Sequence, residues 1–77
     1  MTRPDHRIEA AMRIVANGRT YEIEPQTTVS SFIRSRSLDP RFVIVERNGE
    51  PLERRSYDDV VLAEGDRVEL VRAVAGG

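Results

Sequence analysis

The residues with the clearest chemical potential in this sequence are the two glycines that close it, Gly76 and Gly77. Glycine has no Cβ, so the pair can pass through a channel too narrow for other residues and adopt backbone geometries that others cannot. The α-carboxyl of Gly77, with a reference pKa of about 3.3 to 3.7, is ionised at neutral pH and can attack a phosphorus centre. We therefore treat this carboxylate as the candidate reactive group, with an inert, frayed end as the alternative.

The other side chains offer little chemistry of their own. The chain has no cysteine, which removes thiolate nucleophiles and thiolate metal ligands, and its one histidine, His6, has no second histidine to share a metal with. Asp58 and Asp59 are adjacent carboxylates, but nothing near them indicates the burial that acid–base work requires, so they favour a loop or helix start. The sequence predicts neither a metal site nor a catalytic residue of its own.

Length and charge narrow the class of protein further. The 77 residues allow one domain, and a net charge of −1 with interspersed signs does not resemble the broad positive field of a nucleic-acid-binding protein. No apolar run approaches the roughly 20 residues of a membrane span, and the first residues lack the apolar core of a signal peptide. We expect a cytoplasmic protein whose partners are proteins, with no nucleic acid and no membrane among them.

The first half of the chain predicts a hairpin followed by a helix. Residues 1–10 are polar and lack periodicity, which favours a mobile arm, whereas residues 12–16 and 20–24 alternate around Asn17-Gly18, a pair typical of a type I′ turn. Thr27 or Thr28 can cap the helix that follows. The helix has one apolar stripe, formed by Val29, Phe32 and Ile33. We expect Asp39-Pro40 to end this helical unit.

The second half predicts two more strands and a short return. "FVIVERNG" indicates a strand that begins at Phe42 and runs into a second Asn-Gly turn, followed by a return through Leu52. An irregular or helical stretch at 57–62 leads to a Gly65-Asp66 turn and a last strand from Arg67. We expect an α+β roll in which the helix crosses one face of a mixed sheet, and the last strand lies beside the first.

Strand alternation assigns a face to each side chain of these two strands. The residues expected to point toward the helix are Val43, Val45, Val68 and Leu70. The open face receives Phe42, Ile44 and Val71, where exposed apolar side chains indicate either a partner surface or ordinary scattered surface residues. Arg72, next to the end of the last strand, is expected to steer the tail toward acidic partner residues or simply to be solvated.

Taken together, these motifs resemble one known family. The Asn17-Gly18 hairpin, the helix, "LDPRFVIVERNG", "VLAEGDRVELVRAV" and the final Gly-Gly resemble the ubiquitin-like β-grasp sulfur carriers of the ThiS/MoaD family, and most closely its ThiS branch. The resemblance covers residues 11–77. It implies a β-grasp domain at 11–72, a flexible carrier tail at 73–77, and an N-terminal arm at 1–10 outside the family pattern.

The resemblance implies a carrier that other proteins act upon. A ThiF-like enzyme would use ATP to adenylate the Gly77 carboxylate, and sulfur from a donor such as a cysteine desulfurase would convert it to a thiocarboxylate. A ThiG-like thiazole synthase would then place this sulfur in the thiazole ring of thiamine. The chain itself would bind no cofactor. Its tail, with Val74, Ala75 and Gly76 in the partner's channel, spans at most about 17 Å at ~3.3 to 3.6 Å per residue.

Two departures bear on the branch of the family. MoaD-like subunits usually carry a proline pair before the final glycines, where this chain has Arg72-Ala73-Val74-Ala75, which favours the thiamine branch. Many ThiS sequences have a third glycine where Ala75 stands, so the place where the channel narrows stays open. The alternatives are a carrier for molybdopterin or cysteine synthesis, and a ubiquitin-like interaction module whose tail does no chemistry.

Overall fold

The computed structural model describes residues 11–73, and the chain opens with the expected hairpin. Strands β1 (Met12–Ala16) and β2 (Arg19–Ile23) pair antiparallel, with Ala16 opposite Arg19. Asn17 and Gly18 join them with φ values of 51° and 83°. Both turn positions lie in the left-handed region, as a type I′ turn requires, so the prediction from the Asn-Gly pair is confirmed.

Helix α2 (Val29–Ser35) begins where the sequence predicts. The side-chain oxygen of Thr28 accepts a hydrogen bond from the backbone N–H of Ser31 at 3.1 Å, which satisfies one of the free donors of the first turn. The apolar stripe of Val29, Phe32 and Ile33 is buried against the sheet. Local capping and the apolar stripe therefore agree on the start and the orientation of the helix.

The end of α2 differs from the expectation, because the helix stops before Asp39-Pro40. Ser37 takes a left-handed φ of 63°. Its N–H donates to the Arg34 carbonyl, and the N–H of Leu38 donates to the Ile33 carbonyl, which is the Schellman pattern. Asp39 instead caps a short 3₁₀ helix, η1 (Pro40–Phe42), by accepting from the backbone N–H of Arg41. Glycine usually occupies this position, and because the chain has a serine there, the sequence did not predict that the helix ends here.

The remaining strands follow the predicted order. Strand β3 (Val43–Arg47) runs through the turn at Asn48-Gly49 into the short β4 (Glu50–Pro51), and β5 (Arg67–Arg72) comes last. A second 3₁₀ helix, η2 (Arg54–Ser56), starts the segment whose carbonyls accept hydrogen bonds from the first residues of α2. Residues 57–62 are irregular apart from one bridge between Val61 and Thr28.

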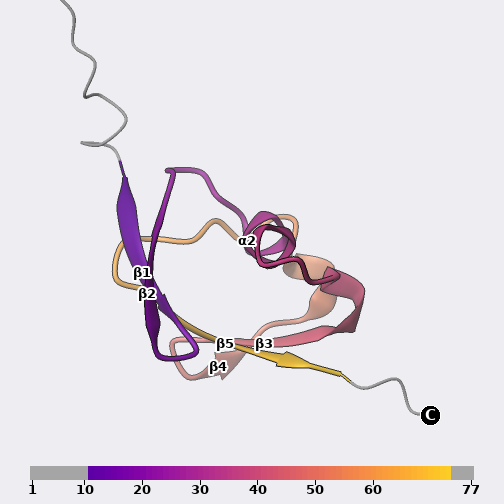
Figure 1. Cartoon of the computed structure of the whole chain (residues 1–77). Coiled ribbons are helices and arrows are strands. Elements are labelled where there is room, and N and C mark those ends of the chain that lie inside the picture. The colour runs from indigo at the N-terminus through magenta and orange to yellow at the C-terminus, as the bar shows by residue number, and fades with distance from the viewer. Residues whose placement is uncertain (1–10, 74–77) are drawn as a thin grey trace, which may run out of the picture.

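The strands form a mixed sheet in the order β2-β1-β5-β3-β4, which α2 crosses on one face (Figure 1). Strands β1 and β5 are parallel, and β3 is antiparallel to both β4 and β5. The predicted α+β architecture and the pairing of the last strand with the first are both confirmed. Strand β5 is central: its first residues pair with both β1 and β3, and its last residues, which precede the tail, pair with β3.

The core lies between α2 and the sheet. Ten apolar residues are buried there: Ile14, Ala16, Val29, Phe32, Ile33, Val43, Val45, Tyr57, Leu62 and Val68. The three inward valines of β3 and β5 are among them, and Leu70 packs against the cluster while partly buried. The buried hydroxyl of Tyr57 donates to the Val43 carbonyl at 2.8 Å, which ties the irregular segment to β3. Within residues 11–73, no helix has the length and hydropathy of a membrane span.

Candidate functional site

The candidate site lies where β5 ends. Ala73 is the last described residue, and its N–H donates to the Phe42 carbonyl at 2.7 Å, which extends the β3–β5 ladder one step beyond Arg72. The chain is therefore still attached to the sheet at the first position of the expected tail. Val74, Ala75, Gly76 and Gly77 lie outside the described residues, as does the expected arm at 1–10, so the expectations for both stay predictions.

Two of the predicted docking residues lie together on the open face of the sheet, and a third, Phe42, lies at its edge. Ile44 and Val71 face each other across the β3–β5 ladder, with 49% and 55% of their surface exposed. Phe42, 49% exposed, precedes β3 and sits beside Ala73. Residues that pair across a ladder share a face, and Phe42 lies at the edge of this pair, at the end of η1, where it also borders a pocket on the helix side. We call Phe42, Ile44 and Val71, next to the base of the tail, the apolar patch. Exposed aromatic and aliphatic side chains that gather in this way are typical of a protein contact surface.

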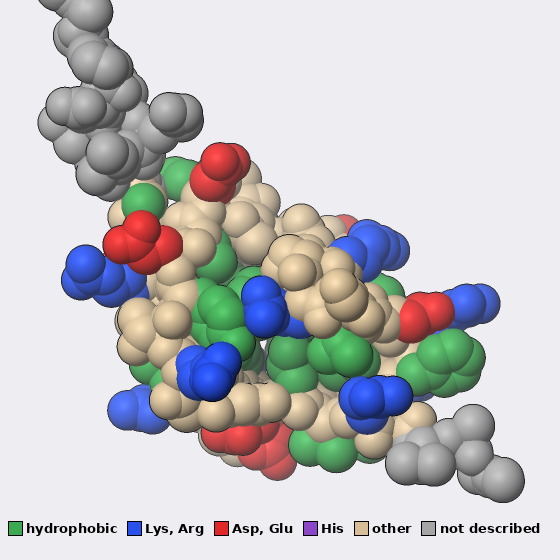
Figure 2. Space-filling view, in the orientation of Figure 1, with side chains coloured by type: hydrophobic (Ala, Val, Ile, Leu, Met, Phe, Trp, Pro, Cys, Tyr) green, Lys and Arg blue, Asp and Glu red, His purple; other side chains and the backbone are tan. Residues whose placement is uncertain are grey.

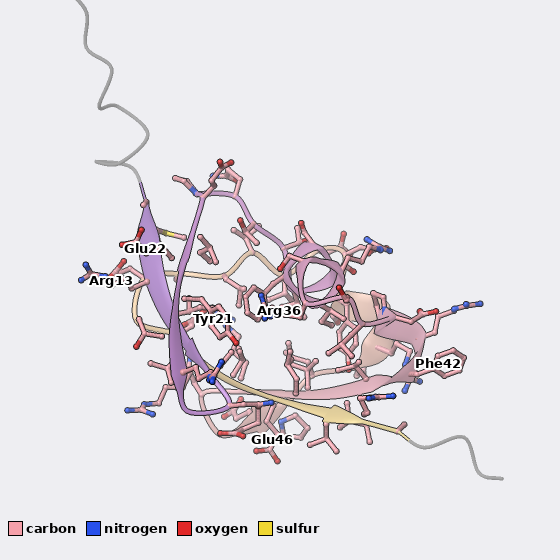
Figure 3. All side chains as sticks on the ribbon, viewed as in Figure 1. Arg13, Tyr21, Glu22, Arg36, Phe42 and Glu46 are labelled. Atoms are coloured by element: carbon pink, nitrogen blue, oxygen red, sulfur yellow. The ribbon has the colours of Figure 1, made fainter. Side chains whose placement is uncertain are left out.

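An acidic pair borders the apolar patch. The next pair along the same face is Glu46 opposite Glu69, and both side chains are exposed. Figure 3 shows Glu46 on the side of the sheet away from α2. Like charges directly opposite each other weaken a strand pair, so this arrangement does not stabilise the sheet. It gives the open face an apolar end near the tail and a negative end beyond it.

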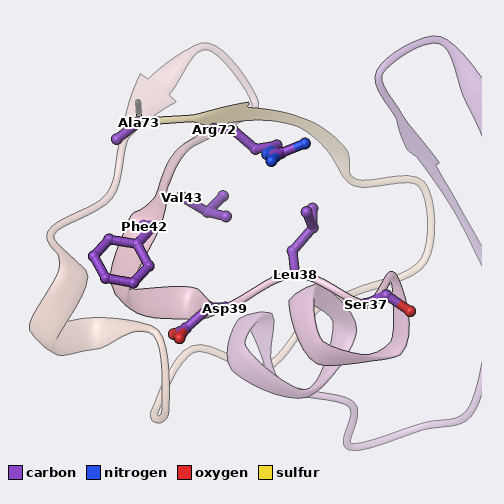
Figure 4. Close-up of a pocket in the computed structure, with 7 residues that line it drawn as sticks. All are labelled: Ser37, Leu38, Asp39, Phe42, Val43, Arg72 and Ala73. Carbon is purple, nitrogen blue, oxygen red and sulfur yellow. The ribbon is translucent and has the colours of Figure 1, made fainter. Parts of the chain in front are cut away.

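Arg72, the fourth predicted docking residue, lies on the other face. It pairs with the buried Val43, so its side chain is on the side of the sheet that α2 covers. There it borders a pocket of about 630 Å³ whose lining also includes Leu38, Phe42 and Ala73. Figure 4 shows Arg72 and Leu38 extending toward each other across this pocket. The structure therefore places Arg72 on the face opposite Ile44 and Val71, while Phe42 borders the same pocket as Arg72 beside the base of the tail.

An ion pair stands beside Phe42. Asp39 accepts from the guanidinium of Arg41 at 2.8 Å and from its backbone N–H at 2.9 Å. These two hydrogen bonds to Arg41 lower the pKa of the Asp39 carboxyl from 3.8 to about 2, so Asp39 is ionised at neutral pH. The Arg41 guanidinium lies 5.3 Å from the centre of the Phe42 ring, within cation–π range. The pair lies at one edge of the apolar patch.

The start of β5 is fixed by polar side chains that the sequence did not single out for this role. Asp66 is 6% exposed and accepts from Arg47 at 2.9 Å, from Asn48 at 3.0 Å and from the Ala63 N–H at 2.8 Å. Burial alone would raise the pKa of Asp66, but these hydrogen bonds outweigh it and hold the pKa below its ordinary value. The Gly65-Asp66 turn signal located the residue without revealing its partners, because those partners come from a distant turn.

Asn17 makes a second set of hydrogen bonds that fix β5. Its side-chain amide donates to the Leu70 carbonyl at 3.1 Å, and its carbonyl oxygen accepts from the Leu70 N–H at 2.7 Å. The hairpin turn therefore holds the middle of β5 in the same way as a neighbouring strand would. Together with the Asp66 contacts, these bonds hold β5 in place up to the base of the tail.

The acidic side chains of the described region do not form a metal site. In the part of the chain from 11 to 73, no three Cys, His, Asp or Glu side chains are arranged to hold a metal ion. Asp58 and Asp59 are exposed, and Asp58 accepts a hydrogen bond from the buried Ser30 hydroxyl, which agrees with their expected loop role. His6 lies outside the described residues. What this region offers is a contact surface beside the start of the tail.

The architecture agrees with that of known proteins. A thiamine biosynthesis protein (ThiS) from Geobacter metallireducens superimposes with a TM-score of 0.70 at 29% identity, covering 86% of this chain and all of that one. A designed protein based on a ubiquitin template superimposes with a TM-score of 0.52 at 20% identity, which shows the fold alone. The mixed sheet crossed by one helix is thus a ubiquitin-like β-grasp domain.

Sequence comparison defines the family. The model of the ThiS family matches residues 10–77. The sulfur carrier protein ThiS of Bacillus subtilis is 36% identical over 62 residues, which are 79% of this chain and 94% of that protein. The chain belongs to the ThiS family.

Two further relatives are much longer proteins. A thiazole synthase of Paramagnetospirillum magneticum is 35% identical over 66 residues, and one of Magnetococcus marinus is 36% identical over the same length. Each match covers 86% of this chain, but the chain spans only about a fifth of either thiazole synthase. These synthases therefore contain a ThiS-like segment within a larger chain.

Proposed function

We propose that this protein is a sulfur carrier for thiazole formation in thiamine biosynthesis, with the Gly77 carboxyl as the group that carries sulfur. The observation that carries the proposal is the extent of the family match, which runs through residue 77 and so includes both glycines. The match of the β-grasp body to named ThiS proteins supports the same role. The protein acts as a co-substrate of other enzymes and has no catalytic residue of its own in this proposal.

The chemistry proceeds in two displacements. A ThiF-like enzyme positions the Gly77 carboxylate against ATP, a carboxylate oxygen bonds to the α-phosphorus, and pyrophosphate leaves. A sulfide nucleophile, released when a thiol reductant cleaves the persulfide of a donor such as a cysteine desulfurase, then attacks the acyl carbon, and AMP leaves with the oxygen. The product is a thiocarboxylate at Gly77. The ATP and the catalytic groups belong to the partner enzyme.

A ThiG-like thiazole synthase is the proposed recipient of the sulfur. Two relatives named thiazole synthase carry a segment similar to this chain, which supports a working association between the two activities. The same relatives favour the thiazole pathway over molybdopterin or cysteine synthesis. With Ala73 bonded to Phe42, only residues 74–77 remain to reach a partner, and they span at most about 14 Å when extended. The apolar patch would then lie against the surface around the partner's active site.

The test is the intact mass of the full chain after incubation with ATP, a ThiF-like enzyme and sulfide. We expect a gain equal to the exchange of one oxygen for sulfur, and fragmentation should locate it at Gly77. A variant that lacks Gly77 should fold as well as the parent and gain nothing. An unchanged mass, with an enzyme shown to be active on the Bacillus subtilis ThiS, would reject this role for the chain.

A further inference from the structure

A groove with an arginine rim runs between the C-terminal end of α2 and strand β5. Two adjoining pockets form it and share Leu38: the pocket beside Arg72, and one of about 360 Å³ between the hairpin and the end of α2. We call it the arginine groove and define it by Arg19, Tyr21, Arg36, Leu38, Leu70 and Arg72. It lies on the helix side of the sheet, opposite Ile44 and Val71, and Phe42 of the apolar patch borders it at one end.

The floor of the arginine groove is apolar. Tyr21, Leu38 and Leu70 are partly buried and pack against the core. The left-handed turn at Ser37 places Leu38 here, because it reverses the chain at the end of α2. The Tyr21 ring packs edge-on against Phe32, with ring centres 5.4 Å apart. These contacts hold the side chains of the floor in position for an incoming apolar side chain.

The rim of the groove carries three exposed arginines, Arg19, Arg36 and Arg72. It also carries one carboxylate, Asp39, which is already paired with Arg41. None of the three arginines forms an ion pair or a side-chain hydrogen bond with the residues that the structure describes, as is also true of Arg34, Arg54 and Arg67. The other described arginines, Arg13, Arg41, Arg47 and Arg55, have carboxylate partners. The Arg36 guanidinium lies 4.7 Å from the centre of the Tyr21 ring, and Figure 3 shows the two together between β2 and α2. Figure 2 shows basic side chains around a recess with apolar atoms inside.

The charge of this groove is local. The whole chain has a net charge of −1, and the opposite face of the sheet carries Glu46 facing Glu69. A positive rim in a slightly acidic protein therefore favours partners whose contacting surface is negatively charged. Guanidinium groups also suit carboxylates, which they bind with two parallel hydrogen bonds.

We propose that the arginine groove docks an acidic protein segment with one apolar anchor residue, supplied by the enzyme that receives the tail. The groove ends at Arg72, directly before Ala73, so a segment bound there lies beside the start of the tail. Carboxylates of the segment pair with the rim, and its aliphatic or aromatic side chain packs on Leu38 and Leu70. The identity of the enzyme rests on the proposed function, but the chemistry of the groove does not.

The first experiment titrates the isotopically labelled full chain with a blocked peptide in which one leucine is flanked by two glutamates on each side. We expect saturable amide shifts at Arg19, Leu38 and Leu70 that weaken as salt is added. The matched peptide with glutamines in place of glutamates should shift these amides far less. Shifts confined to Ile44 and Val71, or none at all, would overturn the proposal. Equal shifts from inorganic phosphate would do the same, since they would define a small-anion site.

The second experiment compares two double variants that remove the same charge. Arg19→Gln with Arg72→Gln alters the groove, and Arg54→Gln with Arg67→Gln removes two exposed arginines elsewhere. We expect the groove variant to raise the Kd for a ThiF-like enzyme, and the KM of adenylation, by about five- to twentyfold, with kcat unchanged. The control should change either value less than twofold. Equal effects in both variants would mean that overall charge, and not the groove, governs binding.

A failure of the proposed sulfur-carrier function can be told apart from a failure of the groove proposal. If the wild-type chain binds the enzyme but gains no sulfur, the carrier chemistry at Gly77 is wrong, and the Kd values still compare the groove with its control. If the wild-type chain does not bind the enzyme, the peptide titration alone decides whether the groove binds acidic segments. A peptide that fails to shift the groove then overturns the inference.

Discussion

The two faces of the β3–β5 ladder differ in what covers them. Val43, Val45 and Val68 point toward α2 and are almost fully buried, whereas Ile44 and Val71, on the same two strands, are about half exposed. These are all β-branched residues with the same preference for strands, so propensity does not distinguish them. The difference between them comes from helix α2, which covers only one face of the sheet. The inner face stabilises the fold, and the outer face is left for recognition.

This division depends on strand register. A slip of one residue would turn Val71 inward and Val68 outward, because side chains alternate along a strand. Hydrogen bonds from polar side chains prevent such a slip: Asp66 holds the start of β5, and Asn17 brackets Leu70. The two faces therefore stay distinct because polar contacts at the edges of the core, and not apolar packing alone, fix where β5 begins.

The largest expected effect comes from the inner face. Phe32 is 3% exposed and packs edge-on against Tyr21, so Phe32→Ala should lower the free energy of unfolding by about 3 to 5 kcal/mol. Urea denaturation measures this, with Ile44→Ala as the outer-face control, expected to change it by less than about 1 kcal/mol. Equal losses in the two variants would show that the faces do not differ in the way their burial indicates.

The sequence predicted the fold well because its signals are local. Two Asn-Gly pairs marked the turns, and alternation assigned Val43, Val45 and Val68 to the core and Ile44 and Val71 to the open face, all of which the structure confirms. Alternation also places Arg72 on the helix side with Val68. The docking role of Arg72 was inferred from its position next to the tail, and its pairing with Val43 places it on the face opposite Ile44 and Val71.

What the sequence did not predict depends on contacts between distant residues. Ser37 gave no sign that it would end the helix, because serine rarely takes the left-handed conformation that glycine takes easily. The partners of Asp66 lie on another turn, and the stacking of Arg36 on Tyr21 joins the helix end to the hairpin. The arginine groove is formed by residues that lie far apart in the sequence, so no short motif predicts it.

A smaller effect is expected at the contacts that fix the register. Asp66→Asn should lower the free energy of unfolding by about 2 kcal/mol, because Arg47 and Asn48 lose an ionised acceptor in a largely buried site. The pKa of Asp66 is lowered in the folded protein, so its contribution is fully present above the unfolded value of 3.8 and is lost as the pH falls through the lower folded value. Thermal melts between pH 3 and 6 should show a steeper acid loss in the wild type than in the variant.

Asp39→Asn is the matched control for this measurement. Arg41 lowers the pKa of Asp39 to about 2, but the pair is at the surface and is screened by solvent. Its removal should leave the melting temperature and its dependence on pH nearly unchanged. If both variants behave alike in acid, the loss of stability comes from general charge repulsion and not from the contacts of Asp66.

The smallest effect on folding, and the one that concerns recognition, is expected on the outer face. Ile44→Asp and Val71→Asp should each leave the melting temperature within a few degrees of the wild type, because both side chains are about half exposed. Each should raise the KM of the carrier in adenylation by about tenfold, as the loss of roughly 1.4 kcal/mol at an interface anchor predicts. Val61→Asp, an exposed valine far from the ladder pair, adds the same charge and should change the KM little. If Val61→Asp weakens adenylation as much as Val71→Asp does, the added charge is responsible, and the apolar patch is ordinary surface.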